Sequence, residues 1–536
     1  MEALDQESVV APGDIREAPV SMTTTDSNLT GSWKFFRPRA AQRLASCAAA
    51  CPIHNLIPAV MDALQRGDQD TALARLRRFN PLPAITGRVC PNFCQEQCNR
   101  KKLDQKVLIG SIERYLGDFG LNVAYPAAGQ KRNERVAVIG SGPAGLAAAY
   151  FLAGSGLQVT VMEKEDSPGG LLRYGIPPYR LPRDILDREV NNLIRSMGID
   201  FQPARDVKTE EIFDLLQDFD FVFCAPGLGS TVVPPEFRDM EAEIEPGLRL
   251  LKDLNEGKTP PGDRFAVVGG GNVAVDVARS LIRCGKQVHI VYRRTFEDMP
   301  AYTDEKTQAL EEGVRLWEKR LIRSIDKGEN GLHLTLARAE KQNGGIRAGQ
   351  TAGEFEVDRV VLATGQTAHM DLPEAERVFW GGDYSIGAAT VVEAMATGQK
   401  AAEAILEKID PELSMDCFQP GKDLPAIEPE GINLDFEVKR PRIEIEELDP
   451  ETRRTSFAEI RPGLEHEEIM EAASRCLGCG SCSSCGLCWF FCPDVAISLD
   501  QNEQAAGPVF DLEHCKGCGL CAAVCSRGVI QLEEDV

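Results

Sequence analysis

A strand, glycine-rich turn, helix and strand near residue 140 constrain the fold of this chain more than any other feature. The run RVAVIG (135–140) is short, apolar and β-branched, which is typical of a buried parallel strand. It leads into GSGPAG, an apolar helical run and a second strand, QVTVME, which ends at Glu163, 23 positions after Gly140. This arrangement predicts a dinucleotide-binding βαβ unit, in which Glu163 accepts a hydrogen bond from a ribose 2′-hydroxyl. The turn supplies the candidate pyrophosphate-binding residues Gly140, Gly142, Pro143 and Gly145.

The same pattern recurs at residues 264–294, in RFAVVGGGNVAVDVARSLIRCGKQVHIVYRR. Its glycine motif is Gly269-x-Gly271-x-x-Ala274. Where the first unit has Glu163, this one has Arg293 and Arg294. A carboxylate would repel a 2′-phosphate, whereas guanidinium groups bind it, so we predict NADP(H) at this second site. The alternative, a solvated basic turn, fits the strand-end position less well.

Composition restricts the classes of partner. The chain has a net charge of −23, which argues against nucleic acid or an anionic membrane surface as partner. It contains no apolar run of 18 residues, and its first 29 residues are acidic and polar, so we expect a cytoplasmic protein with a disordered leader and no membrane insertion. Disulfides are disfavoured in that compartment, so the 18 tightly spaced cysteines indicate metal ligation.

Two cysteine runs near the C-terminus have the spacing of bacterial ferredoxins, C-x2-C-x2-C-x3-C, in which the fourth cysteine of each run ligates the other cluster. One predicted [4Fe-4S] cluster therefore takes Cys482, Cys485, Cys488 and Cys525. The other takes Cys492, Cys515, Cys518 and Cys521. A zinc ribbon normally has paired C-x2-C motifs, which makes zinc the weaker interpretation.

Ten cysteines remain outside these runs. Three of them, Cys224, Cys284 and Cys417, stand alone and are expected to be packed or free thiols. The other seven are Cys47, Cys51, Cys90, Cys94, Cys98, Cys476 and Cys479, one fewer than two four-ligand clusters need. We predict that the segment around Cys476 and Cys479 folds back to complete two N-terminal clusters, with the carboxylate of Glu113 as the eighth ligand.

These features predict a multidomain α/β protein with a C-terminal ferredoxin-like α+β domain. The expected organisation is a disordered leader (1–29), an α-helical iron–sulfur domain (30–125), a first dinucleotide domain (130–245 and 373–410), a second (246–372), a linker (411–474) and a domain with two [4Fe-4S] clusters (475–536).

Seven segments together resemble the glutamate synthase small (β) subunit family of NADPH-dependent flavin and iron–sulfur oxidoreductases. They are ITGRVCPNFCQEQC, VAVIGSGPAGLAAA, GGLLRYGIPPYRLP, VVGGGNVAVDVAR with VYRRTFEDMPA, and LATGQ with the later GGD. The resemblance covers residues 45–408, and the ferredoxin-like tail resembles a variant branch of the family.

The resemblance implies FAD at the first site and NADPH at the second, with two N-terminal clusters that have one non-cysteine ligand. For FAD it adds Gly170 and Leu171 near the flavin and Asp383 near the ribityl chain. For NADPH it adds Asn272 and Val273 beside the glycines and arginines already named, with Gly365 in the LATGQ segment. Pro226 replaces a threonine that is common in the family.

We therefore predict an electron-transfer subunit that oxidises NADPH, or reduces NADP+, through FAD and four [4Fe-4S] clusters. Its partner would be a redox protein such as a ferredoxin, or a large catalytic subunit. One alternative is a free-standing NADPH:ferredoxin or metal-ion reductase. Another is a structural docking subunit whose clusters carry no electrons.

Overall fold

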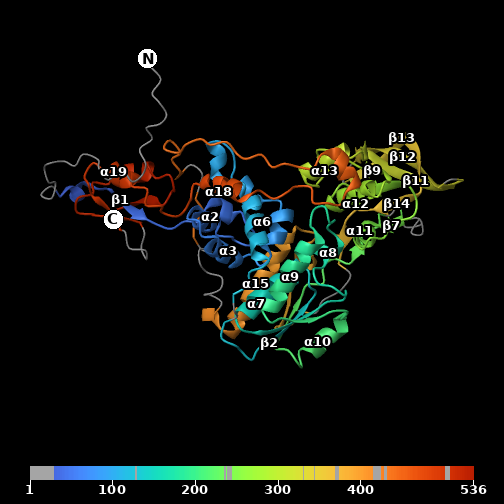
Figure 1. The fold of residues 1–536 in the computed structure, drawn as a ribbon, viewed down its shortest axis with the longest axis horizontal. Helices are drawn as coiled ribbons and strands as arrows, with labels where there is room; N and C mark the ends of the chain where they lie inside the picture. The colour runs from blue at the N-terminus through green and yellow to red at the C-terminus, as the bar shows by residue number, and fades with distance from the viewer. Residues whose placement is uncertain are drawn as a thin grey trace, which may run out of the picture.

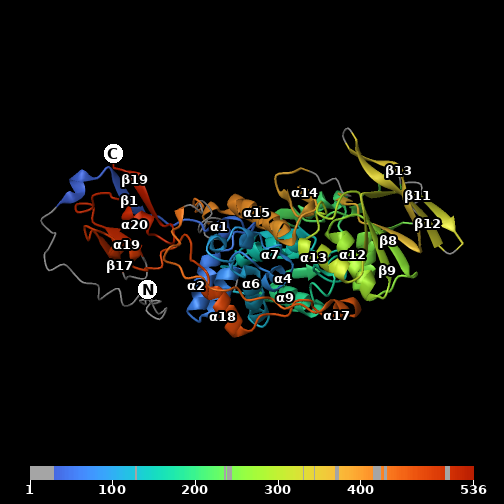
Figure 2. The same cartoon turned by 90° about the horizontal axis from the view of Figure 1, so that it is seen from above.

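The computed structural model describes residues 29–535 apart from 127–128, 235–236, 238–243, 330, 343–344, 369–373, 414–423, 428–430 and 501–506. The predicted leader, except Leu29, and Cys417 lie outside the described residues. The molecule is elongated, with the C-terminal lobe and the second dinucleotide domain at opposite ends and the helical domain between them (Figures 1 and 2).

The first dinucleotide domain contains a five-stranded parallel sheet with the order β16-β5-β2-β3-β4. Its strands are β2 (Arg135–Ile139), β3 (Gln158–Met162), β4 (Asp200–Gln202), β5 (Phe221–Cys224) and β16 (Val378–Trp380). Helix α7 (Pro143–Gly154) follows the glycine turn and packs against α15 (Val391–Ile409). Because α7 contacts both the sheet and α15, it is buried nearly all round, which explains its uniformly apolar sequence.

The second dinucleotide domain repeats this plan with the parallel order β10-β9-β8-β14-β7. Its strands are β7 (Ile244–Pro246), β8 (Arg264–Val268), β9 (Gln287–Tyr292), β10 (Arg315–Glu318) and β14 (Arg359–Leu362). The helices are α11 (Gly247–Asn255), α12 (Asn272–Arg283) and α13 (Thr303–Glu311). An antiparallel sheet of β11 (Arg320–Gly328), β12 (Gly331–Gln342) and β13 (Gly345–Val357) is inserted before β14. Two short paired strands, β6 (Ser230–Thr231) and β15 (Gln366–Thr367), lie where the chain passes between the two domains.

The central domain is helical, with its apolar core between α2, α3 and α6. Its helices are α1 (Ser46–Ala49), α2 (Ile57–Gln65), α3 (Gln69–Arg77), α4 (Pro83–Val89), α5 (Phe93–Glu96) and α6 (Ile109–Gly120). The segment predicted as a linker adds a further helix, α18 (His466–Ser474), which packs on α2 and α6. Its buried residues Ile469 and Ala473 belong to the core of this domain, so that part of the predicted linker is a structural element.

The C-terminal lobe contains α19 (Leu487–Phe490), β17 (Ile497–Asp500), β18 (Gly507–Phe510), α20 (Leu520–Ala523) and β19 (Ile530–Glu534). Strand β1 (Phe36–Ala40) pairs antiparallel with β19, so the first and last strands of the described chain share one sheet (Figure 2). The prediction that residues 30–125 form an α-helical domain is wrong for β1, because its hydrogen-bond partner lies almost 500 residues away, beyond the reach of any local sequence pattern.

The segment between residues 440 and 465 connects the domains. Arg453, in α17 (Pro450–Thr455), forms an ion pair with Glu311 of the second dinucleotide domain, at 2.6 Å. Ile460 donates its N–H to the carbonyl of Tyr179 in the first dinucleotide domain, at 3.1 Å. Glu459 contacts Arg88 of the helical domain at 2.9 Å, so one strap touches all three domains.

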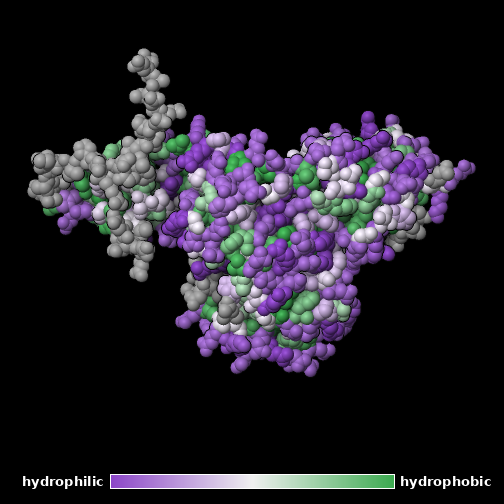
Figure 3. All heavy atoms as spheres, in the orientation of Figure 1, coloured by the Kyte–Doolittle hydropathy of each residue, from purple (hydrophilic) through white to green (hydrophobic). Residues whose placement is uncertain are grey.

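No helix in the described residues is long and apolar enough to cross a membrane. The face in Figure 3 is mostly hydrophilic, with small scattered apolar areas.

Candidate functional site

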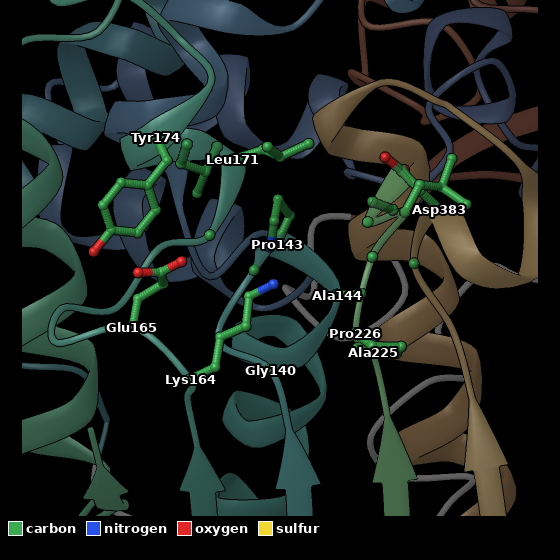
Figure 4. Close-up of a pocket in the computed structure, with 18 of the residues that line it drawn as sticks. Gly140, Pro143, Ala144, Lys164, Glu165, Leu171, Tyr174, Ala225, Pro226 and Asp383 are labelled. Atoms are coloured by element: carbon green, nitrogen blue, oxygen red, sulfur yellow. The ribbon is translucent and has the colours of Figure 1, made fainter. Parts of the chain in front are cut away.

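A cavity of about 530 Å³ opens at the carboxyl ends of the strands of the first sheet (Figure 4). In open parallel sheets this edge is where nucleotides bind. Most residues predicted for the first site line it: Gly140, Gly142, Pro143, Glu163, Gly170, Leu171 and Asp383. Pro226 and Ala225, at the end of β5, line it as well.

Two glycines of the first motif have different structural roles. A Cβ atom on Gly142 would meet no protein atom within 4 Å, so the backbone faces open space that a pyrophosphate can enter. A Cβ on Gly145 would lie 1.9 Å from the carbonyl oxygen of Gly140, so this glycine permits close packing of helix on strand and does not line the cavity. A Cβ atom on Gly271, in the second motif, would likewise meet no protein atom within 4 Å. Both turns therefore fit a dinucleotide.

The Glu163 carboxylate is buried at the end of β3. Its Oε2 accepts hydrogen bonds from the N–H and hydroxyl of Ser141, at 2.8 and 2.6 Å. Its Oε1 accepts from the N–H of Glu165 at 3.0 Å. The carboxylate thus ties the glycine turn to the neighbouring strand and also faces the cavity.

Asp383 lies across the cavity from Glu165 and Tyr174, at the start of α14 (Asp383–Ile386) (Figure 4). Burial raises the pKa of its carboxyl to about 6, and the nearby Glu393 carboxylate raises it as well, while a hydrogen bond to the backbone of Ala389 lowers it. Asp383 is therefore a carboxylate at neutral pH that takes up a proton in mildly acidic solution.

A larger cavity, of about 980 Å³, lies at the corresponding edge of the second sheet. All residues predicted for the second site line it: Gly269, Gly271, Asn272, Val273, Arg293, Arg294 and Gly365. Its lining guanidinium groups are those of Arg180, Arg293, Arg294 and Arg320, and its lining carboxylates are those of Asp276, Asp383 and Glu393.

The two cavities meet. Leu171, Ile176, Leu248 and Asp383 line both of them. Beside this junction, Arg180 of the first domain contacts Asp276 of α12, with 2.8 Å between Nη1 and Oδ2. Two ligands bound in these cavities could therefore contact each other without crossing protein.

The structure brings the N-terminal cysteines into two groups. One group consists of Cys51, Cys90, Cys94 and the carboxylate of Glu113. The other consists of Cys47, Cys98, Cys476 and Cys479, which line a common small cavity. Burial raises the pKa of the Cys51 and Cys47 thiols, and neighbouring acidic groups raise it further, so bound cations would be needed to hold these groups as thiolates.

Glu113 lies half-buried on α6 and faces the first group. Burial raises its pKa to about 7, while hydrogen bonds to Thr86 and Asn80 lower it. The Nδ2 of Asn80 donates to its Oε1 at 3.2 Å and that of Asn55 to its Oε2 at 3.5 Å. A carboxylate without a cationic partner among these contacts is suited to a positively charged centre.

The C-terminal cysteines also fall into two groups. Cys488 has Cys482, Cys485 and Cys525 as neighbours. Cys492, Cys515, Cys518 and Cys521 line one small cavity in the other half of the lobe. Within the described parts of the chain, no three histidine, cysteine, aspartate or glutamate side chains converge tightly enough to hold a single metal ion.

Three family models match this chain. The pyridine nucleotide-disulphide oxidoreductase model matches residues 134–398. The model of dihydropyrimidine dehydrogenase domain II, 4Fe-4S cluster, matches residues 40–124, and a 4Fe-4S binding domain matches 508–531. The fold and the cavities, with these matches, define an oxidoreductase with FAD- and NADP-binding domains and 4Fe-4S domains.

Comparison with relatives narrows the class of oxidoreductase to one family. The chain is 31% identical to the glutamate synthase [NADPH] small chain of Escherichia coli, over 68% of this chain and 88% of the relative. It is 33% identical to the NAD-dependent dihydropyrimidine dehydrogenase subunit PreT of Escherichia coli, over 67% of this chain and 90% of the relative. It therefore belongs to the family of FAD and iron–sulfur oxidoreductase subunits that includes the glutamate synthase small chain.

A third relative is longer. The NADP(+)-dependent formate dehydrogenase subunit beta of Moorella thermoacetica is 36% identical over 67% of this chain, which spans 59% of that relative's length.

Several lining residues were not predicted. Arg180, Asp276 and Tyr302 line the second cavity near the junction, and Arg320 lies beside Arg293 and Arg294. Arg180 belongs to GGLLRYGIPPYRLP, a segment used above only for the resemblance, and Asp276 follows the second glycine motif by one helical turn. Position within a motif was thus the signal that could have located Arg180 and Asp276. Arg320 lies outside every motif.

Proposed function

We propose that this chain is an electron-transfer subunit that oxidises NADPH, or reduces NADP+, and exchanges electrons with a partner oxidoreductase through FAD and four [4Fe-4S] clusters. The observation that carries the proposal is that the two nucleotide cavities meet and that the second of them borders the first cysteine group. When bound, FAD would exchange a hydride with NADPH and single electrons with the clusters.

The lining of the two cavities supports direct contact between the cofactors. Leu171 and Ile176 provide apolar walls at the junction, which exclude water from a transferred hydride. Arg293 and Arg294 would hold the 2′-phosphate of NADPH at the other end of its cavity, and the Arg180–Asp276 ion pair would keep the two domains at a constant angle.

The first cysteine group is adjacent to the second cavity. Val89 lines the second cavity, and the next residue along the chain is Cys90. Burial raises the pKa of Tyr302, which lines the same cavity, and the neighbouring Cys90 also raises it. We propose that Cys51, Cys90, Cys94 and Glu113 ligate the cluster nearest the flavin.

The other three cysteine groups follow the first one in a series. Cys94 of the first group neighbours Cys47 of the second. The second group contains Cys479, which lies three residues before Cys482 of the third group, the one around Cys488. The fourth group, the one with Cys492, contains Cys518, which is the exposed cysteine among those described. This order supports a single series of clusters that ends at the surface of the C-terminal lobe, where a partner could exchange electrons.

The partner and the compartment are part of the proposal. The relatives named above include subunits of larger oxidoreductases, which supports a redox partner protein or large catalytic subunit. We place the protein in the cytoplasm, where grouped thiols are kept available as cluster ligands.

An anaerobic titration with NADPH, followed by absorbance, tests the proposal. Bleaching of both the flavin bands and the broad iron–sulfur absorption is expected for a connected series. Bleaching of the flavin alone would contradict electron flow from NADPH to the clusters. Iron that stays oxidised even with a strong chemical reductant would support purely structural clusters.

A second candidate is a free-standing NADPH:metal-ion reductase. The reduction of metal ions, though not the free-standing state, is favoured by a relative named NADPH-Fe(3+) oxidoreductase subunit beta from Geobacter sulfurreducens, which is 34% identical over 67% of this chain and 63% of the relative. Purification from the native host separates the two candidates. A second subunit at fixed stoichiometry supports the first, whereas full NADPH-dependent metal reduction by the isolated chain supports the second.

A further inference from the structure

The second cavity has a third guanidinium group that belongs to no nucleotide-binding motif. Arg293 and Arg294 follow β9, as the sequence predicted. Arg320, the first residue of β11 in the inserted antiparallel sheet, lines the same cavity with Leu321 and Ile322. The inserted sheet therefore contributes to the wall of the nucleotide cavity as well as to the outer surface of the domain.

The Arg320 side chain is held by backbone carbonyl groups. Its Nε donates to the carbonyl of Ala352 at 3.2 Å. Its Nη1 donates to the carbonyls of Lys319 and Glu318, at 3.1 and 3.2 Å. A guanidinium has five N–H donors, and among the hydrogen bonds between described residues none involves Nη2. The two N–H groups on Nη2 are thus available to an anionic ligand, and the group that carries them is already oriented.

Arg320 is also fixed relative to the arginines after β9. The N–H of Lys319 donates to the carbonyl of Arg294 at 2.9 Å, which joins the start of β11 directly to the Arg293–Arg294 turn. The backbone that precedes Arg320 is therefore attached directly to the backbone of the Arg293–Arg294 turn, and all three side chains line the same cavity.

Two acidic residues near the three arginines in the sequence, Asp298 and Glu318, do not line the cavity. The Asp298 carboxylate accepts hydrogen bonds from the hydroxyl and N–H of Thr295, at 2.8 and 3.2 Å. The Glu318 carboxylate accepts from the N–H of Phe296. The carboxylates that do line the cavity are Asp276, Asp383 and Glu393, none of which lies in the Arg293–Arg294 turn or in the inserted sheet. A doubly charged phosphate is therefore best accommodated among the three guanidinium groups.

We propose that Arg320 is a specificity-determining residue that binds the 2′-phosphate of NADPH together with Arg293 and Arg294. This inference rests on the proposed use of NADPH and extends it to a residue of the inserted sheet. Recognition of NADPH is then shared between two structural units, because two of the arginines follow a strand of the nucleotide-binding sheet and the third begins the insertion.

The test measures binding of nucleotide fragments to the full-length protein with its cofactors, by isothermal titration calorimetry. The probes are 2′,5′-ADP, which carries the 2′-phosphate, and 5′-AMP, which lacks it. Arg320→Gln is expected to weaken 2′,5′-ADP about tenfold, the effect of losing a charge-assisted contact, and to leave 5′-AMP unchanged. Arg323→Gln is the matched control, because Arg323 lies on the same strand, contacts Thr351 at 3.0 Å and does not line the cavity.

The outcomes separate this inference from the proposed function. Equal affinity of Arg320→Gln and the wild type for 2′,5′-ADP, with the wild type preferring that probe to 5′-AMP, would overturn the role of Arg320 alone. A wild type that binds both probes equally would overturn the NADPH preference as well. If Arg320→Gln does not fold, Arg320→Lys serves instead. An unchanged affinity of that variant for 2′,5′-ADP would contradict the proposal that the oriented N–H groups of the Arg320 guanidinium bind the 2′-phosphate.

Discussion

Arg180 and Asp276 form a buried ion pair across the boundary between the two dinucleotide domains. Nη1 of Arg180 lies 3.0 and 2.8 Å from the two carboxylate oxygens, and the two side chains are 9% and 7% exposed. Nε of Arg180 contacts Glu305 at 3.2 Å. Both side chains line the second cavity, so the pair joins the two domains at the wall of the proposed NADPH site.

Removing Arg180 should destabilise the protein and slow reduction of the flavin by NADPH. Arg180→Met leaves the Asp276 carboxylate buried without its main partner, a change that typically costs about 3–5 kcal/mol. Urea unfolding and stopped-flow absorbance measure the two effects. Lys208→Met is the control, because its ion pair with Asp206 is exposed on both sides. Equal unfolding midpoints for Arg180→Met and the control would contradict the role of the pair.

Replacing Arg293 and Arg294 together with serine should remove the preference for NADPH over NADH. The guanidinium groups supply the contacts that only a 2′-phosphate can use, so kcat/KM for NADPH should fall towards the value for NADH, which should change little. Steady-state kinetics with a dye acceptor measure this ratio. Arg347→Ser, on the exposed hairpin, should leave it unchanged, and an unchanged ratio in the double variant would refute the assignment.

Replacing Cys476 and Cys479 together with alanine should remove one cluster. The protein should lose about four of roughly sixteen irons, because both thiols belong to the group with Cys47 and Cys98. Iron analysis of anaerobically purified protein checks the number. Cys284→Ala should retain all iron, since Cys284 is not a member of any of the four groups. Full iron content in the double variant would show that this segment does not complete an N-terminal cluster.

Affinity for FAD should depend on pH through Asp383. The proposed contact needs an ionised carboxylate that accepts from a ribityl hydroxyl, and burial raises the pKa of this carboxyl to about 6. The contact is therefore present above pH 6 and is lost as the pH falls through that value. Release of FAD followed by its fluorescence, between pH 5 and 8, measures the effect. Asp383→Asn should give a flatter profile over this range, and identical profiles would contradict the contact.

Predictions made from motifs agree with the structure where the motif and its surroundings are contiguous in the chain. The turn at Gly140, the acidic end of the next strand at Glu163 and the arginines after β9 could be located because a βαβ unit is a local structure with a fixed order of strand, turn and helix. The ferredoxin spacing likewise specifies its own pairing of cysteines. These parts of the fold and the candidate sites were readable from the sequence.

Contacts between distant segments could not be predicted in the same way. Strand β1 pairs with β19 from the other end of the described chain, and α18 completes the core of a domain that begins more than 400 residues earlier. The grouping of Cys476 and Cys479 with Cys47 was inferred only from a missing ligand.

By itself, the sequence determined the class of protein, the two nucleotide motifs and the set of candidate ligands, because these depend on residue types at short, fixed spacings. Only the tertiary structure decided that the two cavities meet, that Arg180 reaches Asp276 and that Arg320 lines the same cavity as the arginines after β9. Such contacts depend on how separately folded units pack, and that packing is specified by surface shape and charge over whole domains, which no short pattern records.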